Sequence, residues 1–129
     1  MIKGFHVLLS SADPKADREF LRDTLALTYV DSHDGWLICA LPPAELGVHP
    51  RETEGEHTLF LMCDDVETTT ADLESTGARF IGGVSDDEGV GRFATLSLPG
   101  GGTMGPYEPT HATPLPGWPT SRPAETRFD

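Results

Sequence analysis

The chain has 129 residues, 37% of them hydrophobic, which is enough for one globular domain with its own core. Its 21 acidic residues outnumber its 9 basic ones and give a net charge of -12. That charge opposes binding to the phosphates of nucleic acid or to an anionic membrane.

The hydrophobic run at the N-terminus contains His6 and is too short for a signal peptide or a membrane span, so we expect a cytoplasmic protein. Cys39 and Cys63 both lie in hydrophobic, strand-like stretches. We expect them to pack as small buried side chains rather than to form a disulfide or a zinc site.

An internal repeat runs through most of the chain. Residues 5–13 align with residues 57–65 at a constant offset of 52, which places His6 over Thr58 and Asp13 over Asp65. Such a repeat constrains the fold more firmly than the propensity of any single segment.

The first repeat unit begins with a strand predicted at residues 5–11. Asp13 is a helix N-cap residue, and hydrophobic residues at helical spacing follow it. Three strands are predicted after this helix, near 28–32, at 36–42 and at 45–50.

The second unit repeats this order. A strand at 57–63 is followed by a helix between Asp65 and Gly77, then by strands at 79–84, 93–99 and 103–109. The run Gly100-Gly101-Gly102 lies between two strands and precedes no helix, so it predicts a hairpin turn rather than a phosphate-binding loop.

Residues 110–129 carry four prolines, Pro114, Pro116, Pro119 and Pro123, with little periodicity. This composition predicts a Pro-rich, extended C-terminal tail. Trp118 is its bulkiest side chain, and we expect it to anchor the tail to this subunit or to a neighbouring one.

The repeat predicts an α+β fold made of two βαβββ modules. Module one covers about residues 1–50 and module two about residues 57–109, within a single domain at 1–109. A lone sheet with one helix leaves one face uncovered, so we expect the modules to pair as a curved, half-open mixed sheet around a cleft.

These features resemble the glyoxalase / bleomycin-resistance / extradiol dioxygenase (vicinal oxygen chelate) superfamily. The resemblance rests on a histidine in the first strand, a capped helix, the repeat, and a closing strand that ends Gly-Pro-Tyr-Glu-Pro. Members include isomerases, lyases, dioxygenases, thiol transferases and antibiotic-sequestering proteins, so the resemblance implies a fold rather than a reaction. It also implies a homodimer, in some members with modules exchanged between chains.

The resemblance further implies where a metal would bind. Metal-using members take ligands from the first and last strands of both modules, and these positions fall here on His6, Gly47, Thr58 and Gly105. His6 is the only one of the four with a donor side chain. We therefore expect a site without metal.

Nearby donors keep the metal hypothesis open. Glu45 and His49 share strand parity with Gly47, whereas His57 faces away from Thr58 unless the register slips. If a divalent metal such as Zn, Ni, Fe or Mn binds, we expect His6, Glu45 and His57 to hold it.

Side-chain alternation also predicts which residues face the cleft. They form a hydrophobic and aromatic wall with a few polar groups, as expected for a small-molecule site. The alternative is that the aromatic side chains fill the middle of a closed sheet. The candidate ligand-binding residues are His6, Trp36, Glu45, His49, Thr58, Phe60, Met62, Phe93 and Tyr107.

The leading hypothesis is a protein that binds a small hydrophobic or aromatic molecule in this cleft, with no cofactor. The alternative is a metal-dependent lyase, isomerase or extradiol-type dioxygenase. A third is an interaction module whose cleft is filled by its own side chains. No catalytic residue is identified from the sequence, and His6 is expected either to contact the ligand or to bind the metal.

Overall fold

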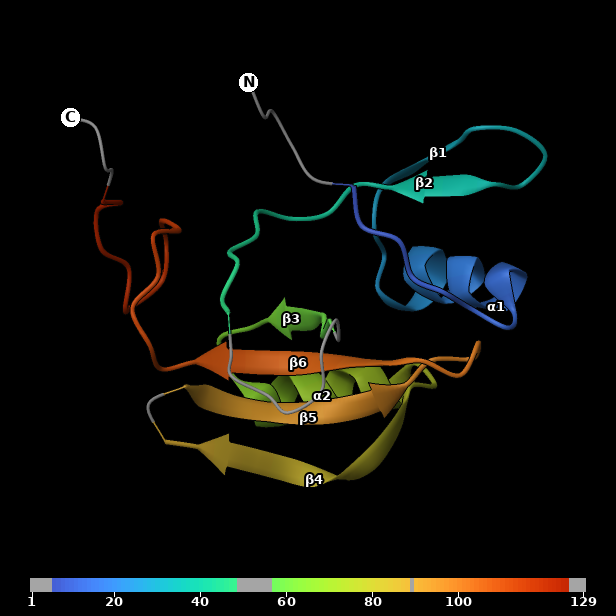
Figure 1. Cartoon of the computed structure of the whole chain (residues 1–129). Helices are drawn as coiled ribbons and strands as arrows, with labels where there is room; N and C mark the ends of the chain where they lie inside the picture. Colours follow the sequence, from blue (N-terminus) through green and yellow to red (C-terminus); the bar gives the residue numbers. More distant parts are fainter. Residues whose placement is uncertain (1–5, 49–56, 89, 126–129) are drawn as a thin grey trace.

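The computed structural model describes residues 6–48, 57–88 and 90–125. It contains a two-stranded and a four-stranded sheet with helices beside them, which confirms the α+β class (Figure 1). In chain order the elements are α1 (Pro14–Glu19), the π-helix η1 (Phe20–Thr24), β1 (Tyr29–Asp31), β2 (Leu37–Cys39), β3 (Phe60–Met62), α2 (Val66–Ser75), β4 (Arg79–Asp87), β5 (Gly91–Ser97) and β6 (Thr103–Pro109). None of the described helices is long and hydrophobic enough to cross a membrane.

Module two is a complete βαβββ unit. Its strands lie in the order β3-β6-β5-β4, with β3 parallel to β6 and the other pairs antiparallel. The Asp65 side chain accepts a hydrogen bond from the Thr68 amide at 3.0 Å and caps α2, as predicted. Gly77 follows the helix with a φ of +101°, which also agrees with the predicted helix end.

One face of the four-stranded sheet packs against α2. In the register of the sheet, Leu96 lies opposite Met104 on one side and Phe80 on the other. These side chains form a hydrophobic core with Leu73 of α2 and Phe20 of η1. Figure 1 shows α2 lying along this face.

The opposite face, which we call the open face, is not covered by any helix among the described residues. Phe60 lies opposite Gly105, and both Met62 and Phe93 lie opposite Tyr107, so alternation directs these side chains away from α2. The open face includes Phe60, Met62, Phe93, Thr95, Ser97, Thr103, Gly105 and Tyr107, together with Arg79, Ile81, Ser85 and Asp87 of β4.

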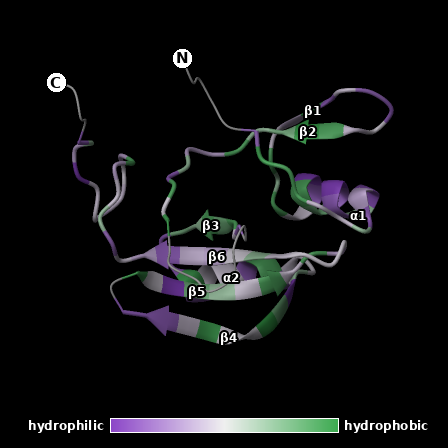
Figure 2. Cartoon of the chain, viewed as in Figure 1, coloured by the Kyte–Doolittle hydropathy of each residue, from purple (hydrophilic) through white to green (hydrophobic). Residues whose placement is uncertain are grey.

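Module one is less regular. The Asp13 side chain accepts from the Ala16 amide at 3.2 Å and caps α1, so both caps predicted by the repeat are present. The helix then widens into η1, where the Leu25 amide donates to the Phe20 carbonyl at 3.1 Å. β1 and β2 form an antiparallel ribbon, and Figure 2 shows β2 as hydrophobic.

Two predicted strands of module one are absent among the described residues. The stretches 6–10 and 41–48 are irregular, and Leu8 is 82% and Val48 96% exposed. A strand requires a hydrogen-bonding neighbour, and the short ribbon β1-β2 does not join the sheet of module two. The paired, half-open sheet is therefore not formed within the described part of one chain.

The tail also differs from the expected extended segment, because it doubles back on itself. The Thr113 amide donates to the Thr120 carbonyl at 3.3 Å, and the Arg122 amide donates to the Thr113 carbonyl at 2.9 Å. Thr113 is only 2% exposed. The buried Thr113 fixes the start of this loop, and Trp118 lies half-buried within it.

The two modules meet at the turn between β5 and β6. The Leu98 amide donates to the Gly102 carbonyl at 2.8 Å, which confirms the predicted hairpin. The buried carboxylate of Asp17 in α1 accepts from the Gly100 amide at 2.8 Å, and the Ala12 amide donates to the Gly100 carbonyl at 3.1 Å. Gly100 is thus held on both sides by module one.

We predict that Gly100→Ala destabilises the protein by about 1 to 3 kcal/mol, measured by chemical denaturation. A Cβ atom at this position would overlap the Ser11 hydroxyl and lie 2.5 Å from an Asp17 carboxylate oxygen. Gly102→Ala is the matched control, because its Cβ would meet only Leu98 at 3.6 Å. Equal stability of the two variants would contradict the proposed contact between the modules.

Candidate functional site

Three aromatic rings from three strands form a continuous cluster on the open face. Phe60 meets Phe93 edge to face with centroids 5.7 Å apart, and meets Tyr107 at 5.1 Å. The Tyr107 hydroxyl donates to the Val90 carbonyl at 2.8 Å. Tyr107 is buried, but Phe60 remains 39% exposed and presents an apolar surface.

A carboxylate from module one lies beside this cluster. Glu45 accepts a hydrogen bond from the hydroxyl of Thr113, and its other oxygen lies 3.3 Å from His111 Nε2. The His111 ring stacks on Tyr107 with centroids 5.9 Å apart. We call Phe93, Phe60, Tyr107 and His111 the aromatic row, and Glu45 lies at its His111 end.

Two carboxylates, Glu45 and Asp87, act on the Tyr107 phenol. The pKa of the Tyr107 phenol is raised by burial and, to a lesser extent, by the charges of Glu45 and Asp87. Burial likewise raises the pKa of the Cys63 thiol, which keeps that group protonated rather than nucleophilic. The arrangement therefore provides stacking surfaces and a hydrogen-bond acceptor for a bound molecule.

The structure brings together part of the predicted set. Glu45, Phe60, Phe93 and Tyr107 meet in the aromatic row or at its end, and Met62 shares the open face. His49 lies outside the described residues, and Thr58 is exposed ahead of β3.

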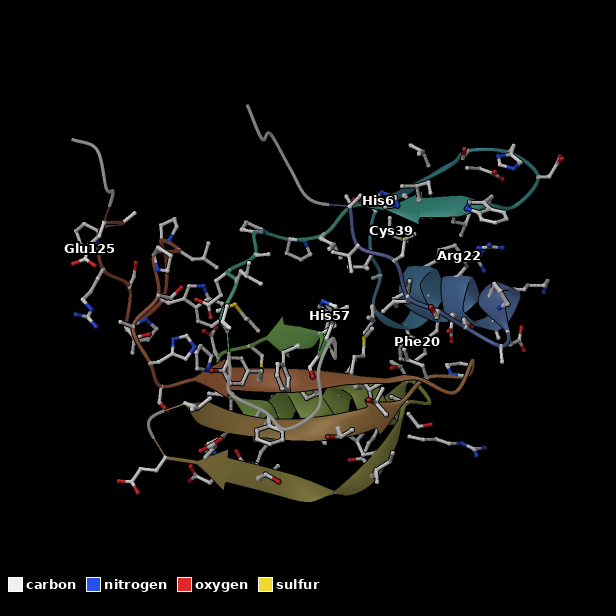
Figure 3. All side chains as sticks on the ribbon, viewed as in Figure 1. His6, Phe20, Arg22, Cys39, His57 and Glu125 are labelled. Carbon is white, nitrogen blue, oxygen red and sulfur yellow. The ribbon has the colours of Figure 1, made fainter. Side chains whose placement is uncertain are left out.

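Two further predicted residues lie in module one, away from the row. His6 is exposed in an irregular segment (Figure 3). Trp36 stacks with His33 at 5.7 Å, and the Arg18 guanidinium lies 4.4 Å from its ring centroid. Neither residue contributes to the aromatic row.

His111 and Thr113 are site residues that sequence reasoning missed. Both lie in the Pro-rich tail, where the absence of periodicity gave no indication of a contact with Glu45. The only available signal was a histidine two residues after the closing strand.

The residues present do not fit the predicted metal site. His6 lies in the irregular segment before α1, His57 lies just before β3, and Glu45 is engaged by His111 and Thr113. Gly105 occupies a family ligand position, but a side chain there would overlap the Ala94 carbonyl oxygen. The described part of the chain thus does not gather these donors around one point.

An acidic cluster elsewhere is explained by structure. Asp65, Glu67 and Glu108 lie close together at the start of α2. Arg92 forms an ion pair with Glu67 and lies 4.0 Å from Glu108, which also accepts from the Val66 amide. These carboxylates already serve the helix terminus and a guanidinium.

A pocket of about 340 Å³ lies in the tail rather than on the open face. Its walls come from both arms of the doubled-back loop, and it flanks His111 in the chain. The lining residues are Thr110, Ala112, Pro119, Thr120, Ser121 and Arg122.

Comparison with known proteins identifies the fold of the chain but not an activity. No protein-family model matches the chain, and no curated protein matches it. Similarity is found only among solved structures.

Three of these structures illustrate the range. The antibiotic binding protein TnmS3 of a Streptomyces species is 24% identical, covers 81% of this chain and 100% of its own, and superposes with a TM-score of 0.55. A lactoylglutathione lyase of Agrobacterium tumefaciens is 16% identical and superposes with a TM-score of 0.54, and the match covers 78% of this chain and 88% of the lyase. A glyoxalase/bleomycin resistance protein/dioxygenase superfamily member from Sphaerobacter thermophilus is 21% identical and superposes with a TM-score of 0.53. The match covers 78% of this chain and 91% of that protein.

We predict that Tyr107 ionises above the ordinary tyrosine pKa of about 10. In Tyr29→Phe, tyrosinate absorbance reports Tyr107 alone, because the chain has two tyrosines. Adding Glu45→Gln should lower the midpoint, since a negative charge that disfavours the phenolate is removed. An unchanged midpoint would contradict the placement of Glu45.

The same shift has a consequence for stability. A phenol whose pKa is higher in the folded than in the unfolded state stabilises the protein. This contribution is complete at pH values below the unfolded-state pKa, and it is lost as the pH rises through the folded-state pKa. The free energy of unfolding should therefore fall above about pH 10, and less steeply in Tyr107→Phe.

Proposed function

We propose that this chain, whose fold is that of the glyoxalase/bleomycin resistance/dioxygenase superfamily, binds a small hydrophobic or aromatic molecule on its open face without a metal. The observation that carries the proposal is the aromatic row with Glu45 at its end. Stacking surfaces with one well-placed polar group are typical of small-molecule sites.

The exposure of Phe60 supports this proposal. A phenyl ring left 39% exposed beside two other aromatic rings keeps apolar surface in contact with water. A planar ligand stacked on it would remove that surface from water. TnmS3, an antibiotic binding protein, has the same fold, so binding without catalysis is a role that this architecture supports.

The competing metal-dependent function is supported by the lactoylglutathione lyase of the same fold. It requires a set of donor side chains that His6, Glu45 and His57 do not form in the described structure. Elemental analysis of the purified protein separates the two functions. Metal retained at one ion per chain would favour the lyase-like alternative.

We predict that 1-methylindole, a flat aromatic probe without a hydrogen-bond donor, binds the protein. Phe60→Ala and Phe93→Ala should each weaken binding by about twofold to tenfold, the loss of one stacked aromatic contact. Trp36→Ala is the matched control, because it removes an exposed aromatic ring in module one. NMR titration measures the dissociation constants, and equal effects of all three substitutions would contradict the site.

We also propose that the protein is a homodimer in which the second copy covers module one. Hydrophobic side chains of module one are exposed in the single chain, and a second copy would remove them from water. The unpaired edges of β1 and β2 and the exposed Leu8 and Val30 lie in this module.

The expected mass by light scattering is therefore twice 13.9 kDa. Val30→Glu should shift the protein toward monomer, because it places a charge on the surface proposed to be buried. Ser75→Glu adds the same charge to an exposed position on α2 and should leave the dimer intact. A parent protein that is monomeric at micromolar concentration would overturn this proposal.

A further inference from the structure

His111 makes two contacts of the kind that a bound aromatic molecule would make. Its ring stacks on Tyr107 with an interplanar angle of 27°, and its Nε2 lies 3.3 Å from Glu45 Oε1. It therefore extends the row of Phe93, Phe60 and Tyr107 by one more ring. This ring comes from the tail rather than from the sheet.

The His111 contact with Glu45 is the replaceable one of the two that hold this carboxylate. Its length of 3.3 Å exceeds that of a strong charge-assisted hydrogen bond, about 2.7 to 2.9 Å, and the His111 side chain is 32% exposed. Thr113, in contrast, is buried and donates to the other oxygen of Glu45. Glu45 thus keeps its orientation if His111 moves away.

Both ring nitrogens of His111 face hydrogen-bond acceptors. Nδ1 lies 2.7 Å from the Ala112 carbonyl oxygen, and Nε2 faces the Glu45 carboxylate. The contact with Glu45 therefore needs only an N–H or O–H donor beside Tyr107, and a bound molecule that carries such a donor could make it in place of His111.

From these contacts, and resting on the proposed function, we infer that His111 occupies the position of the ligand. The ligand class is a planar aromatic compound that carries an N–H or O–H donor. It stacks on Tyr107, donates to Glu45 Oε1 and displaces His111. The tail is thereby an internal competitor of the ligand. The apparent affinity of the protein for the ligand is reduced by the fraction of molecules in which His111 stacks on Tyr107.

Indole and 1-methylindole test the inference, because they share a ring system and differ in the N–H. Indole should bind the parent protein more tightly than 1-methylindole does. Glu45→Gln should weaken indole binding by about tenfold, since it loses a charged acceptor, and should not weaken binding of 1-methylindole, which has no donor for Glu45.

His111→Ala should strengthen indole binding several-fold, because the competing ring is removed. His33→Ala is the matched control: it also removes an imidazole stacked on an aromatic ring, that of Trp36, and should change nothing. In the parent, indole should shift the His111 ring resonances, assigned by their loss in His111→Ala, as the ring leaves Tyr107.

Three outcomes would overturn the inference. They are weaker indole binding in His111→Ala, equal affinity for the two probes in the parent, and His111 resonances that stay in place at saturating indole. In each case 1-methylindole binding that depends on Phe60 would leave the proposed function intact. Failure of 1-methylindole to bind would instead count against the proposed function itself.

Discussion

The sheet of module two has two faces, and α2 covers only one of them. Leu96, Met104 and Leu73 fill the covered face, and this packing stabilises the module. The strands' alternation then places Phe60 and Phe93 on the other face, because side chains of neighbouring residues point in opposite directions. The aromatic row is thus a direct consequence of a sheet with a single covering helix.

Glu45 connects three parts of the molecule that are distant in sequence. It belongs to module one, its oxygens face Thr113 and His111 of the tail, and His111 stacks on Tyr107 of module two. A half-buried carboxylate requires such donors, because burial without them costs more than one hydrogen bond returns. The doubled-back tail supplies these donors through Thr113 and His111. Glu45 therefore joins the organisation of the tail to the polar end of the proposed site.

The parts of the fold that were predictable are those fixed by local rules. The repeat placed caps at Asp13 and Asp65, and both side chains accept the expected amide hydrogen bonds. Strand alternation placed Phe60, Phe93 and Tyr107 on one face for the same reason. The contact of Glu45 with His111 depends on a loop without periodicity, and the strand predicted around Leu8 depends on a neighbouring strand that is absent among the described residues. The sequence pattern of each segment alone therefore could not predict these two features.

The acidity of the chain restricts what the aromatic row can bind. Arg92 is engaged by Glu67 on the α2 side of the sheet, and Arg22 pairs with Asp23 at 2.6 Å. Among the described contacts of the row, His111 is the one basic side chain, and it already faces Glu45. A carboxylate or phosphate ligand at that end of the row would meet the like charge of Glu45. A neutral ligand with a donor group meets an acceptor instead, so the net charge of -12, which by itself indicates solubility, also favours donors over anions at this site.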